Sequence, residues 1–197
     1  LKVFAAATPG AFAMDGSLDS SHYLVADNGM KIWAAVKGTK LYLATWSSAG
    51  GSSDHFLLCS NTFDNPEPHP WAKAGNSNFW FAGRPWLAGE GGDSYHALNH
   101  GGASGRSAMG SGGNVLEAEI DLVEVFGSTP KTVFLSALAY GDNNGAGIAS
   151  QCPAPWGADN DLTIPEMAAV RVDSIRDEDL DGHHDPGAPT FESTAGG

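Results

Sequence analysis

The chain has 197 residues, of which 10 are Lys or Arg and 23 are Asp or Glu, so its formal net charge is -13 at pH 7. Nucleic acids and anionic membranes are also negatively charged and would repel the chain at long range, so neither is expected as a partner. The sequence has no uninterrupted apolar run of about 18 residues, the length that crosses a bilayer as a helix, and a soluble chain is expected.

Short apolar runs separated by glycine and proline predict an all-β chain. The sequence contains 26 Gly and 11 Pro, which divide it into short pieces. The clearest unit pairs residues 30–36 with 41–46 across a glycine-containing turn, a pattern typical of a β-hairpin. Further strands are expected at residues 55–60, 79–82, 115–121, 132–140 and 167–172, with one helical turn at 122–126 ended by Gly127. This spacing predicts a two-sheet antiparallel β-sandwich, jelly-roll or immunoglobulin-like.

We expect one sandwich domain over residues 1–173, followed by an Asp-rich tail over residues 174–197 that leads to a neighbouring module of the same parent chain. Residues 88–113 are rich in Gly, Ser, Asn and His and contain little apolar material. A stretch of that length and composition indicates an ordered functional loop.

The tail reads Asp-Glu-Asp-Leu-Asp-Gly-His-His-Asp over residues 177–185. Oxygen ligands at alternate positions around one glycine match the spacing of a calcium loop. The expected ligands are Asp177, Asp179, Asp181, the backbone carbonyl of His183, and Asp185. Because Ala188 stands where a calcium hand has its bidentate glutamate, the segment is more similar to thrombospondin type 3 and dockerin-like segments, which join modules of exported bacterial proteins. A solvated, flexible tail is the alternative.

A second acidic loop contains Asp159, Asp161 and Glu166 but lacks the glycine. It is a weaker calcium candidate, and an Asx turn leading into the last strand is the alternative. A zinc site at His96 and His100 is not expected, because their segment is too rich in Gly and Asn to form a helix and no Cys stands nearby.

The two cysteines, Cys59 and Cys152, lie far apart in the sequence. A disulfide between them would stabilise the fold by closing a long loop of the unfolded chain, and it would suit a secreted protein. Two unrelated buried thiols are the alternative.

Three segments carry a family resemblance. They are Met-Asp-Gly-Ser-Leu-Asp at residues 14–19, the hairpin at 32–46, and Val-Leu-Glu-Ala-Glu-Ile-Asp-Leu at 115–122 followed by Phe126-Gly127. In order and spacing they resemble the family 9 carbohydrate-binding modules and the related DOMON-type sandwiches over roughly residues 12–172. The resemblance implies an exported β-sandwich, appended to a polysaccharide-active or surface protein, that binds sugar through aromatic platforms and carries structural calcium.

Tryptophans in polar surroundings are the candidate sugar contacts. An indole stacks on the apolar face of a pyranose ring at little entropic cost, while Arg, Asp, Asn and His pair with hydroxyl groups. The expected ligand-binding residues are Trp80, Arg84, Trp86, Asp93, Tyr95, His96, Asn99 and Trp71. Trp80 could instead point inward, with the polar loop covering the sheet. Trp33 and Trp46 lie on the apolar hairpin and are expected in the core.

These observations favour a non-catalytic carbohydrate-binding module of a secreted or surface-attached multimodular protein, monomeric, with Ca²⁺ as a structural ion and a polysaccharide or oligosaccharide as ligand. One alternative is a calcium-stabilised adhesion module that binds no sugar. Another is a small glycosidase or lyase using Glu117, Glu119 or Asp121, although outward-facing strand acids give the same pattern. A heme-binding DOMON relative with Met and His axial ligands is a further alternative.

Overall fold

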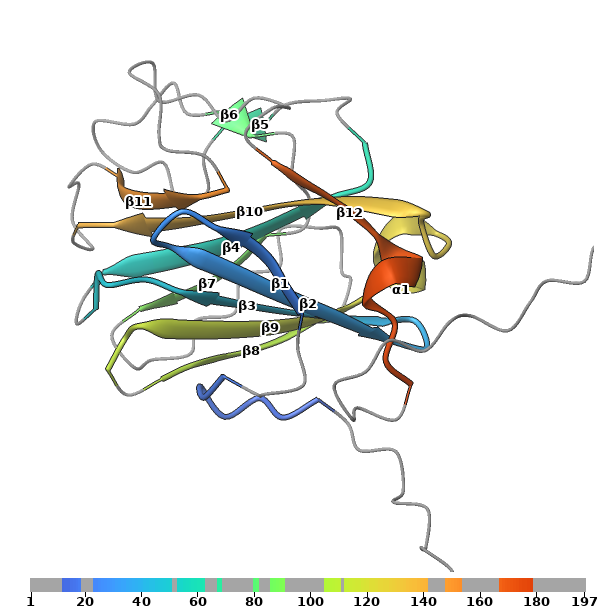
Figure 1. The fold of residues 1–197 in the computed structure, drawn as a ribbon, viewed down its shortest axis with the longest axis horizontal. Helices are drawn as coiled ribbons and strands as arrows, with labels where there is room; N and C mark the ends of the chain where they lie inside the picture. Colours follow the sequence, from blue (N-terminus) through green and yellow to red (C-terminus); the bar gives the residue numbers. More distant parts are fainter. Residues whose placement is uncertain are drawn as a thin grey trace, which may run out of the picture.

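The computed structural model describes residues 12–18, 23–50, 53–62, 67–68, 80–81, 86–90, 105–110, 112–141, 148–153 and 167–178. These residues form two antiparallel sheets packed face to face, as the sequence predicts (Figure 1). Among the described residues, no helix has the length and apolar composition needed to cross a membrane.

Sheet A contains five strands in the order β1-β2-β3-β9-β8. Their bounds are Tyr23–Asp27 for β1, Lys31–Lys37 for β2, Lys40–Trp46 for β3, Val115–Asp121 for β9 and Gly105–Met109 for β8. The predicted hairpin is β2 and β3, and its turn contains Gly38 with a φ of 57°, a left-handed conformation that favours glycine. Sheet A is therefore built around this hairpin, with β1 on one side and β9 on the other.

Sheet B has the order β11-β10-β4-β7, and β12 also pairs with β10. The bounds are Ile148–Cys152 for β11, Thr132–Tyr140 for β10, Asp54–Ser60 for β4, Trp86–Glu90 for β7 and Ala168–Arg171 for β12. One half of β10 pairs with β12 and the other with β11, while β4 occupies its opposite edge. Two further short strands, β5 (Glu67–Pro68) and β6 (Trp80–Phe81), pair antiparallel with each other as a separate two-stranded sheet.

The core between the sheets comes from alternate residues of the central strands. Its fully buried members include Ile32, Ala34, Val36, Leu41, Leu43, Leu116, Ala118 and Ile120 from sheet A, and Leu57, Cys59, Leu87, Leu135, Ala137 and Cys152 from sheet B. Because side chains alternate across a strand, the residues between them lie on the outer faces of the sandwich.

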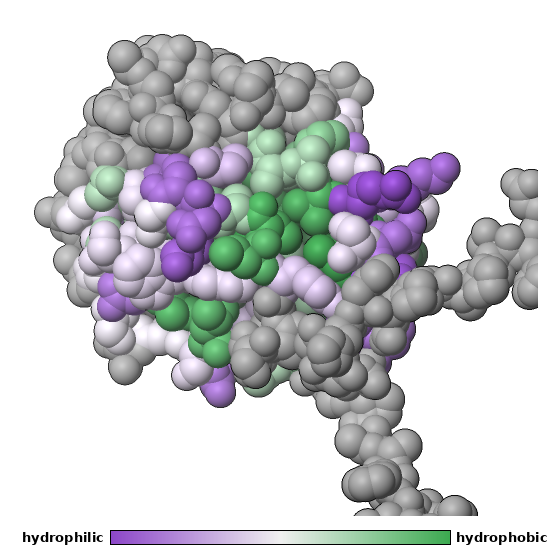
Figure 2. Space-filling view, viewed as in Figure 1, coloured by the Kyte–Doolittle hydropathy of each residue, from purple (hydrophilic) through white to green (hydrophobic). Residues whose placement is uncertain are grey.

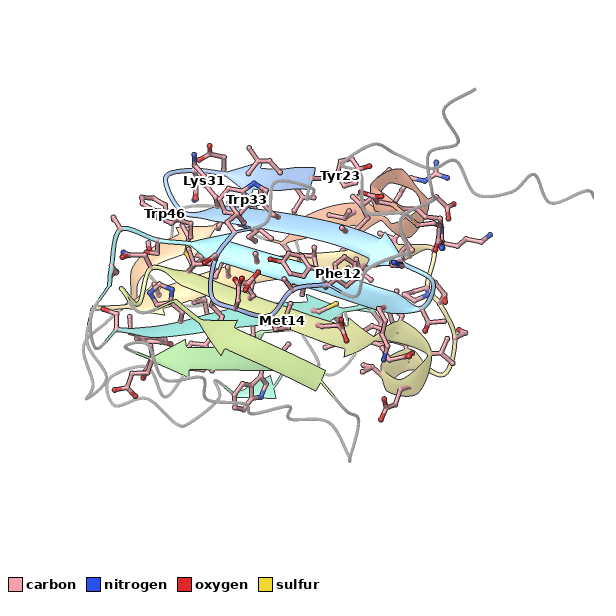
Figure 3. All side chains as sticks on the ribbon, turned by 90° about the horizontal axis from the view of Figure 1, so that it is seen from below. Phe12, Met14, Tyr23, Lys31, Trp33 and Trp46 are labelled. Carbon is pink, nitrogen blue, oxygen red and sulfur yellow. The ribbon has the colours of Figure 1, made fainter. Side chains whose placement is uncertain are left out.

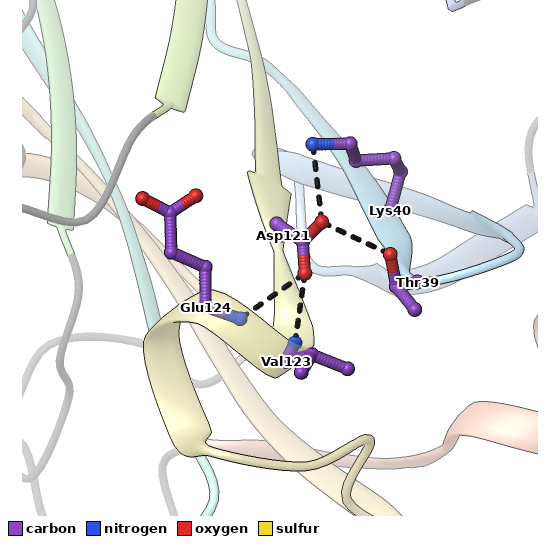
Figure 4. Close-up of polar contacts among 5 residues, drawn as sticks. All are labelled: Thr39, Lys40, Asp121, Val123 and Glu124. Carbon is purple, nitrogen blue, oxygen red and sulfur yellow. Dashed lines mark hydrogen bonds and ion pairs between the residues drawn. The ribbon is translucent and has the colours of Figure 1, made fainter.

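The predicted helical turn is α1, Leu122–Phe126, which follows β9 directly. The Asp121 carboxylate accepts hydrogen bonds from the backbone N–H groups of Val123 and Glu124 and from the Thr39 hydroxyl, and Lys40 Nζ lies 3.2 Å away (Figure 4). Burial raises the pKa of Asp121, but these hydrogen bonds and Lys40 outweigh it and lower the pKa. Asp121 is therefore a helix N-cap, and a left-handed Gly127 ends the turn.

Five strands were not predicted, namely β1, β5, β7, β8 and β11. The expected functional loop at residues 88–113 is therefore partly wrong, since it contains most of β7 and all of β8. β8 reads Gly-Arg-Ser-Ala-Met and lies at the edge of sheet A. An edge strand with small and polar residues shows little of the apolar pattern by which strands are recognised.

The beginning of the Asp-rich tail is bound to sheet A. After the 3-10 turn η3, Val172–Ile175, Arg176 makes a parallel bridge to Val36, and the Asp177 N–H donates to the Val36 carbonyl at 2.8 Å. Glu178 accepts from the Gly38 N–H at 3.0 Å and from Arg176 Nη1 at 2.6 Å. The chain as far as Glu178 is thus held against the β2–β3 hairpin.

Candidate functional site

Two tryptophans lie together on the outer face of sheet A. Ile32 and Ala34 face the core, so Trp33 between them points outward, and the same alternation turns Trp46 outward on β3. Trp33 is opposite Ala44 and Lys31 is opposite Trp46. Trp33 and Trp46 are therefore diagonal neighbours, about 7–8 Å apart. Figure 3 shows both near one end of the sheet.

This pair, here called the tryptophan platform, is open to solvent. Trp46 is 36% exposed and Trp33 is partly exposed. Leu24, opposite Trp33 on β1, is 51% exposed. Figure 2 shows further hydrophobic residues near the centre of the side where Figure 1 draws β1, a view turned by 90° from that of the platform in Figure 3. The platform and Leu24 thus form an accessible apolar area across three strands.

A charged pair borders the platform. Asp27 of β1 is opposite Lys31 of β2, and Lys31 is opposite Trp46 of β3, so the three residues form a row across the sheet. Lys31 Nζ lies 3.5 Å from Asp27 Oδ2, and both side chains are more than a third exposed. Hydrogen-bond donors and acceptors therefore stand at the edge of the exposed rings.

Residues 12–18 cover the middle of the same face (Figure 3). Phe12 packs on Tyr42 with 5.1 Å between ring centroids, and both rings are buried. The N–H groups of Asp15 and Gly16 donate to Glu117 Oε2 at 3.0 and 2.7 Å. The Tyr42 hydroxyl donates to Glu117 Oε1. Sheet A is thus closed over its centre and open at the tryptophan platform.

Glu117 has a structural role in this closure. It is fully buried, and its two oxygens accept from Tyr42 and from the backbone of residues 12–18. Burial raises the pKa of Glu117, although its three hydrogen bonds oppose the effect. Glu119, on the same face, is 8% exposed. Two of the three acids considered for glycoside cleavage therefore have structural contacts. Glu117 binds residues 12–18, and Asp121 caps α1.

Trp86 does not lie on an exposed platform, so its prediction as an open sugar contact is wrong. It is 5% exposed and packs against Phe56 on the outer face of sheet B, with 5.9 Å between ring centroids. Phe56 in turn meets Tyr140 edge to face at 5.7 Å. The second apolar cluster of the molecule, here called the sheet B cluster, consists of Phe56, Leu58, Trp86, Ala88, Leu138, Tyr140 and Met167. Pairing of Trp86 with Leu58 in β4 places it there.

The expectation that Trp33 and Trp46 fill the core is also wrong. Both strands are apolar on both faces, so alternation alone did not show which face is covered. One signal was present in the sequence. Lys31 and Lys37 share the phase of Trp33 along β2, and lysines rarely point into a core.

Most of the other predicted ligand residues lie outside the described residues. These are Trp71, Arg84, Asp93, Tyr95, His96 and Asn99, while for Trp80 the structure describes the backbone in β6. Their placement therefore stays a prediction.

Of the predicted calcium ligands, the structure describes Asp177, which is fully buried. The others, Asp159, Asp161, Glu166, Asp179, Asp181, His183 and Asp185, lie outside the described part of the chain. Within that part, no group of three or more His, Cys, Asp or Glu side chains could hold a metal ion. The calcium loops stay predictions.

The predicted disulfide is not formed, since Cys59 and Cys152 are both free and buried. Cys59 is opposite Leu135 and Cys152 is opposite Ala137, so β10 separates them. Strands lie about 4.8 Å apart, which puts the two backbones about 10 Å from each other, whereas a disulfide needs Cα atoms within about 7 Å. Burial raises the pKa of both thiols.

A buried polar cluster lies at the end of the sandwich where β3 ends. His55 Nε2 donates to the Ala49 carbonyl at 2.8 Å, and the Ala49 N–H donates to Ser47 Oγ, which lies 2.7 Å from Ser150 Oγ. Burial lowers the pKa of His55 to about 4, against the opposing effect of the bond to Ala49. His55 is therefore neutral at pH 7, with its proton on Nε2.

The chain matches no protein-family model, and no curated protein is significantly similar to it in sequence. The residues and their geometry are therefore the basis for a function.

Proposed function

We propose that the chain is a non-catalytic glycan-binding module and that its ligand stacks on the tryptophan platform of sheet A. The observation that carries the proposal is the exposure of Trp46 beside Trp33 on the rigid surface of a central hairpin. A large indole left 36% exposed next to a second one is costly in water. Stacking of the apolar face of a sugar ring on this indole removes its exposed apolar surface from water, which favours binding.

The surroundings of the platform suit a sugar better than an apolar ligand. Asp27 and Lys31 supply acceptors and donors beside the rings, and hydroxyl groups need both. Hydrogen bonding fixes the orientation of a ligand whose rings are held by stacking. Two neighbouring indoles could contact two successive sugar units of one chain.

Calcium, export and neighbouring modules belong to the same proposal. The calcium loop would begin at Asp177, whose backbone is bonded to β2 in the same sheet that carries the platform. Calcium that binds residues 177–185 more tightly in the folded chain than in the unfolded chain would stabilise the fold by mass action.

A second candidate, favoured by this anchoring of residues 176–178, is a calcium-stabilised surface module that binds no sugar. Thermal unfolding of the full chain with Ca²⁺ and with EDTA tests the calcium part of both candidates. Ca²⁺ should raise Tm, and Asp181→Asn should remove that increase. Equal Tm values with Ca²⁺ and EDTA would overturn the calcium assignment.

Binding to a panel of insoluble polysaccharides and soluble oligosaccharides tests the platform. Trp46→Ala should lower affinity at least tenfold while leaving Tm close to that of the wild type, because Trp46 is at the surface. Val123→Ala is the matched control, since Val123 is 41% exposed on α1, at the opposite end of β9 from the residue that pairs with Trp46.

No retention of the wild type on any glycan would overturn the proposed function. Equal affinity of Trp46→Ala and wild type would overturn the platform as its site. A calcium-dependent Tm without sugar binding would favour the second candidate.

A further inference from the structure

We infer that Lys31 is the specificity-determining hydrogen-bond donor of the tryptophan platform, that Asp27 positions it, and that the pair selects neutral glycans over acidic ones. The inference rests on the proposed function and narrows its ligand class. It is carried by the row Asp27, Lys31 and Trp46 across three strands.

The position of Lys31 follows from the register of the sheet. Residues directly opposite in an antiparallel pair have Cβ atoms about 4.5–5.5 Å apart and point to the same face. Lys31 and Trp46 are such a pair. The Lys31 side chain therefore begins beside the Trp46 indole, and its ammonium group lies toward β1, 3.5 Å from Asp27 Oδ2. A sugar that stacks on Trp46 and extends toward β1 would bring a hydroxyl group to this ammonium.

Asp27 is held in place from two directions. Its Oδ1 accepts from the Gly29 N–H at 3.0 Å, and its Oδ2 lies 3.5 Å from Lys31 Nζ. Gly29 has a φ of 103°, which favours glycine and shapes the β1–β2 turn. The turn thus fixes the carboxylate, and the carboxylate holds the ammonium group on the β1 side of the tryptophan platform.

Lys31 retains hydrogen-bonding capacity for a ligand. An ammonium group has three N–H donors, and within the described part of the chain its ion-pair partner is Asp27. The Lys31 side chain is 38% exposed and that of Asp27 is 43% exposed. An exposed ion pair of this kind contributes little to stability, so its placement next to Trp46 is more informative about binding than about folding.

Charge decides the ligand class. A uronate bound over Trp46 would bring a carboxylate next to Asp27, on a chain with a formal charge of -13. The charge of Lys31 is already balanced by Asp27. A neutral sugar hydroxyl, in contrast, can accept from Lys31 and donate to Asp27 at the same time. The geometry therefore favours neutral, hydroxyl-rich glycans.

The test measures affinity of the full chain for neutral oligosaccharides, such as cello-, xylo- and manno-oligosaccharides, and for oligogalacturonides. Lys31→Ala should weaken neutral binding roughly tenfold, as expected for a lost charge-assisted hydrogen bond, and Lys31→Arg should restore part of it. Lys40→Ala is the matched control, because Lys40 makes a similar ion pair at the other end of β3, and it should bind as the wild type does.

Asp27→Asn gives the second readout. It leaves the charge of Lys31 unbalanced, so oligogalacturonide binding should rise severalfold and become weaker with added salt, while neutral binding falls. A role of Asp27 in stability alone would not change this preference.

The outcomes separate the two proposals. If Trp46→Ala abolishes binding but Lys31→Ala binds neutral glycans as the wild type does, the platform stands and this inference fails. A wild type that prefers oligogalacturonides would overturn it as well. Failure of the wild type to bind any glycan would overturn both the proposed function and this inference.

Discussion

The two outer faces of the sandwich both carry tryptophan and tyrosine, but they differ in how they are covered. On sheet B, Trp86, Phe56 and Tyr140 are buried in one apolar cluster. On sheet A, residues 12–18 close the centre through the buried acceptor Glu117, and the tryptophan platform stays open. The comparison shows that burial or exposure of an aromatic side chain here depends on which segments pack over it. The local sequence around the side chain does not indicate this.

Replacing one tryptophan on each face gives the largest expected contrast. Trp86→Ala should lower the free energy of unfolding by about 3–5 kcal/mol, because it leaves a cavity in the sheet B cluster. Trp46→Ala should lower it by less than about 1 kcal/mol, because the side chain is at the surface. Urea unfolding of the two variants measures both values. Equal losses would show that the two faces are equivalent in packing.

The free energy of unfolding should depend on pH through His55, which lies in the interior between the two sheets. Its folded pKa of about 4 is below the ordinary value of 6.5, so unfolding takes up a proton at lower pH. The free energy of unfolding should therefore fall by about 3 kcal/mol in total as the pH decreases from about 6.5 to about 4. Urea unfolding at several pH values measures this slope.

His55→Gln is the matched variant, because its amide nitrogen can still donate to the Ala49 carbonyl. It should flatten the slope between pH 6.5 and pH 4 even if it is less stable overall. An unchanged slope would assign the acid sensitivity to other groups.

The polar closure of sheet A can be broken at Glu117. Glu117→Ala removes the acceptor of two backbone N–H groups and of the Tyr42 hydroxyl and should cost about 2–3 kcal/mol at pH 7. Glu117→Gln keeps an acceptor and should cost less. The raised pKa of Glu117 means that its contribution to stability is greatest at low pH and decreases as the pH rises through that pKa.

Denaturant unfolding of both Glu117 variants at pH 4 and pH 7 checks this prediction, with hydrogen exchange at Asp15 and Gly16 as a local readout. Faster exchange at these two amides is expected in Glu117→Ala. Unchanged exchange would mean that Glu117 does not hold residues 12–18.

The smallest expected effect is a gain in stability from replacing Gln151 on the outer face of sheet B. Gln151 is 3% exposed and opposite Leu138 of the sheet B cluster, and neither atom of its amide has a hydrogen-bond partner in the part of the chain that the structure describes. Gln151→Leu should therefore raise the free energy of unfolding by about 1 kcal/mol. A loss of stability in thermal unfolding would instead indicate that the amide binds a buried water molecule.

Local signals in the sequence were sufficient for much of the fold. The hairpin of β2 and β3 was predicted from two apolar runs around a glycine turn, and Val115–Asp121 and Thr132–Tyr140 were predicted at their observed bounds. The edge strands β8 and β11 were not found, because their small and polar residues lack the apolar pattern.

The candidate site was harder to predict for a physical reason. A period of two shows that Trp33 and Lys31 share a face, but when both faces of a strand are apolar it does not show which one meets the core. The error for Trp86 was the reverse, because it was expected to be exposed and is buried. Proline, arginine and glycine around it indicated an exposed loop, whereas its strand pairs with β4 and the side chain is buried there.

The sequence by itself determined the sandwich, its central hairpin and the capped turn at α1, because these depend on apolar periodicity, turn glycines and a capping aspartate close in the chain. Only the tertiary structure decided which tryptophans are open, that Glu117 binds residues about a hundred positions away, and that β10 separates Cys59 from Cys152. These features depend on which strands become neighbours and what covers each face, and no local pattern specifies either.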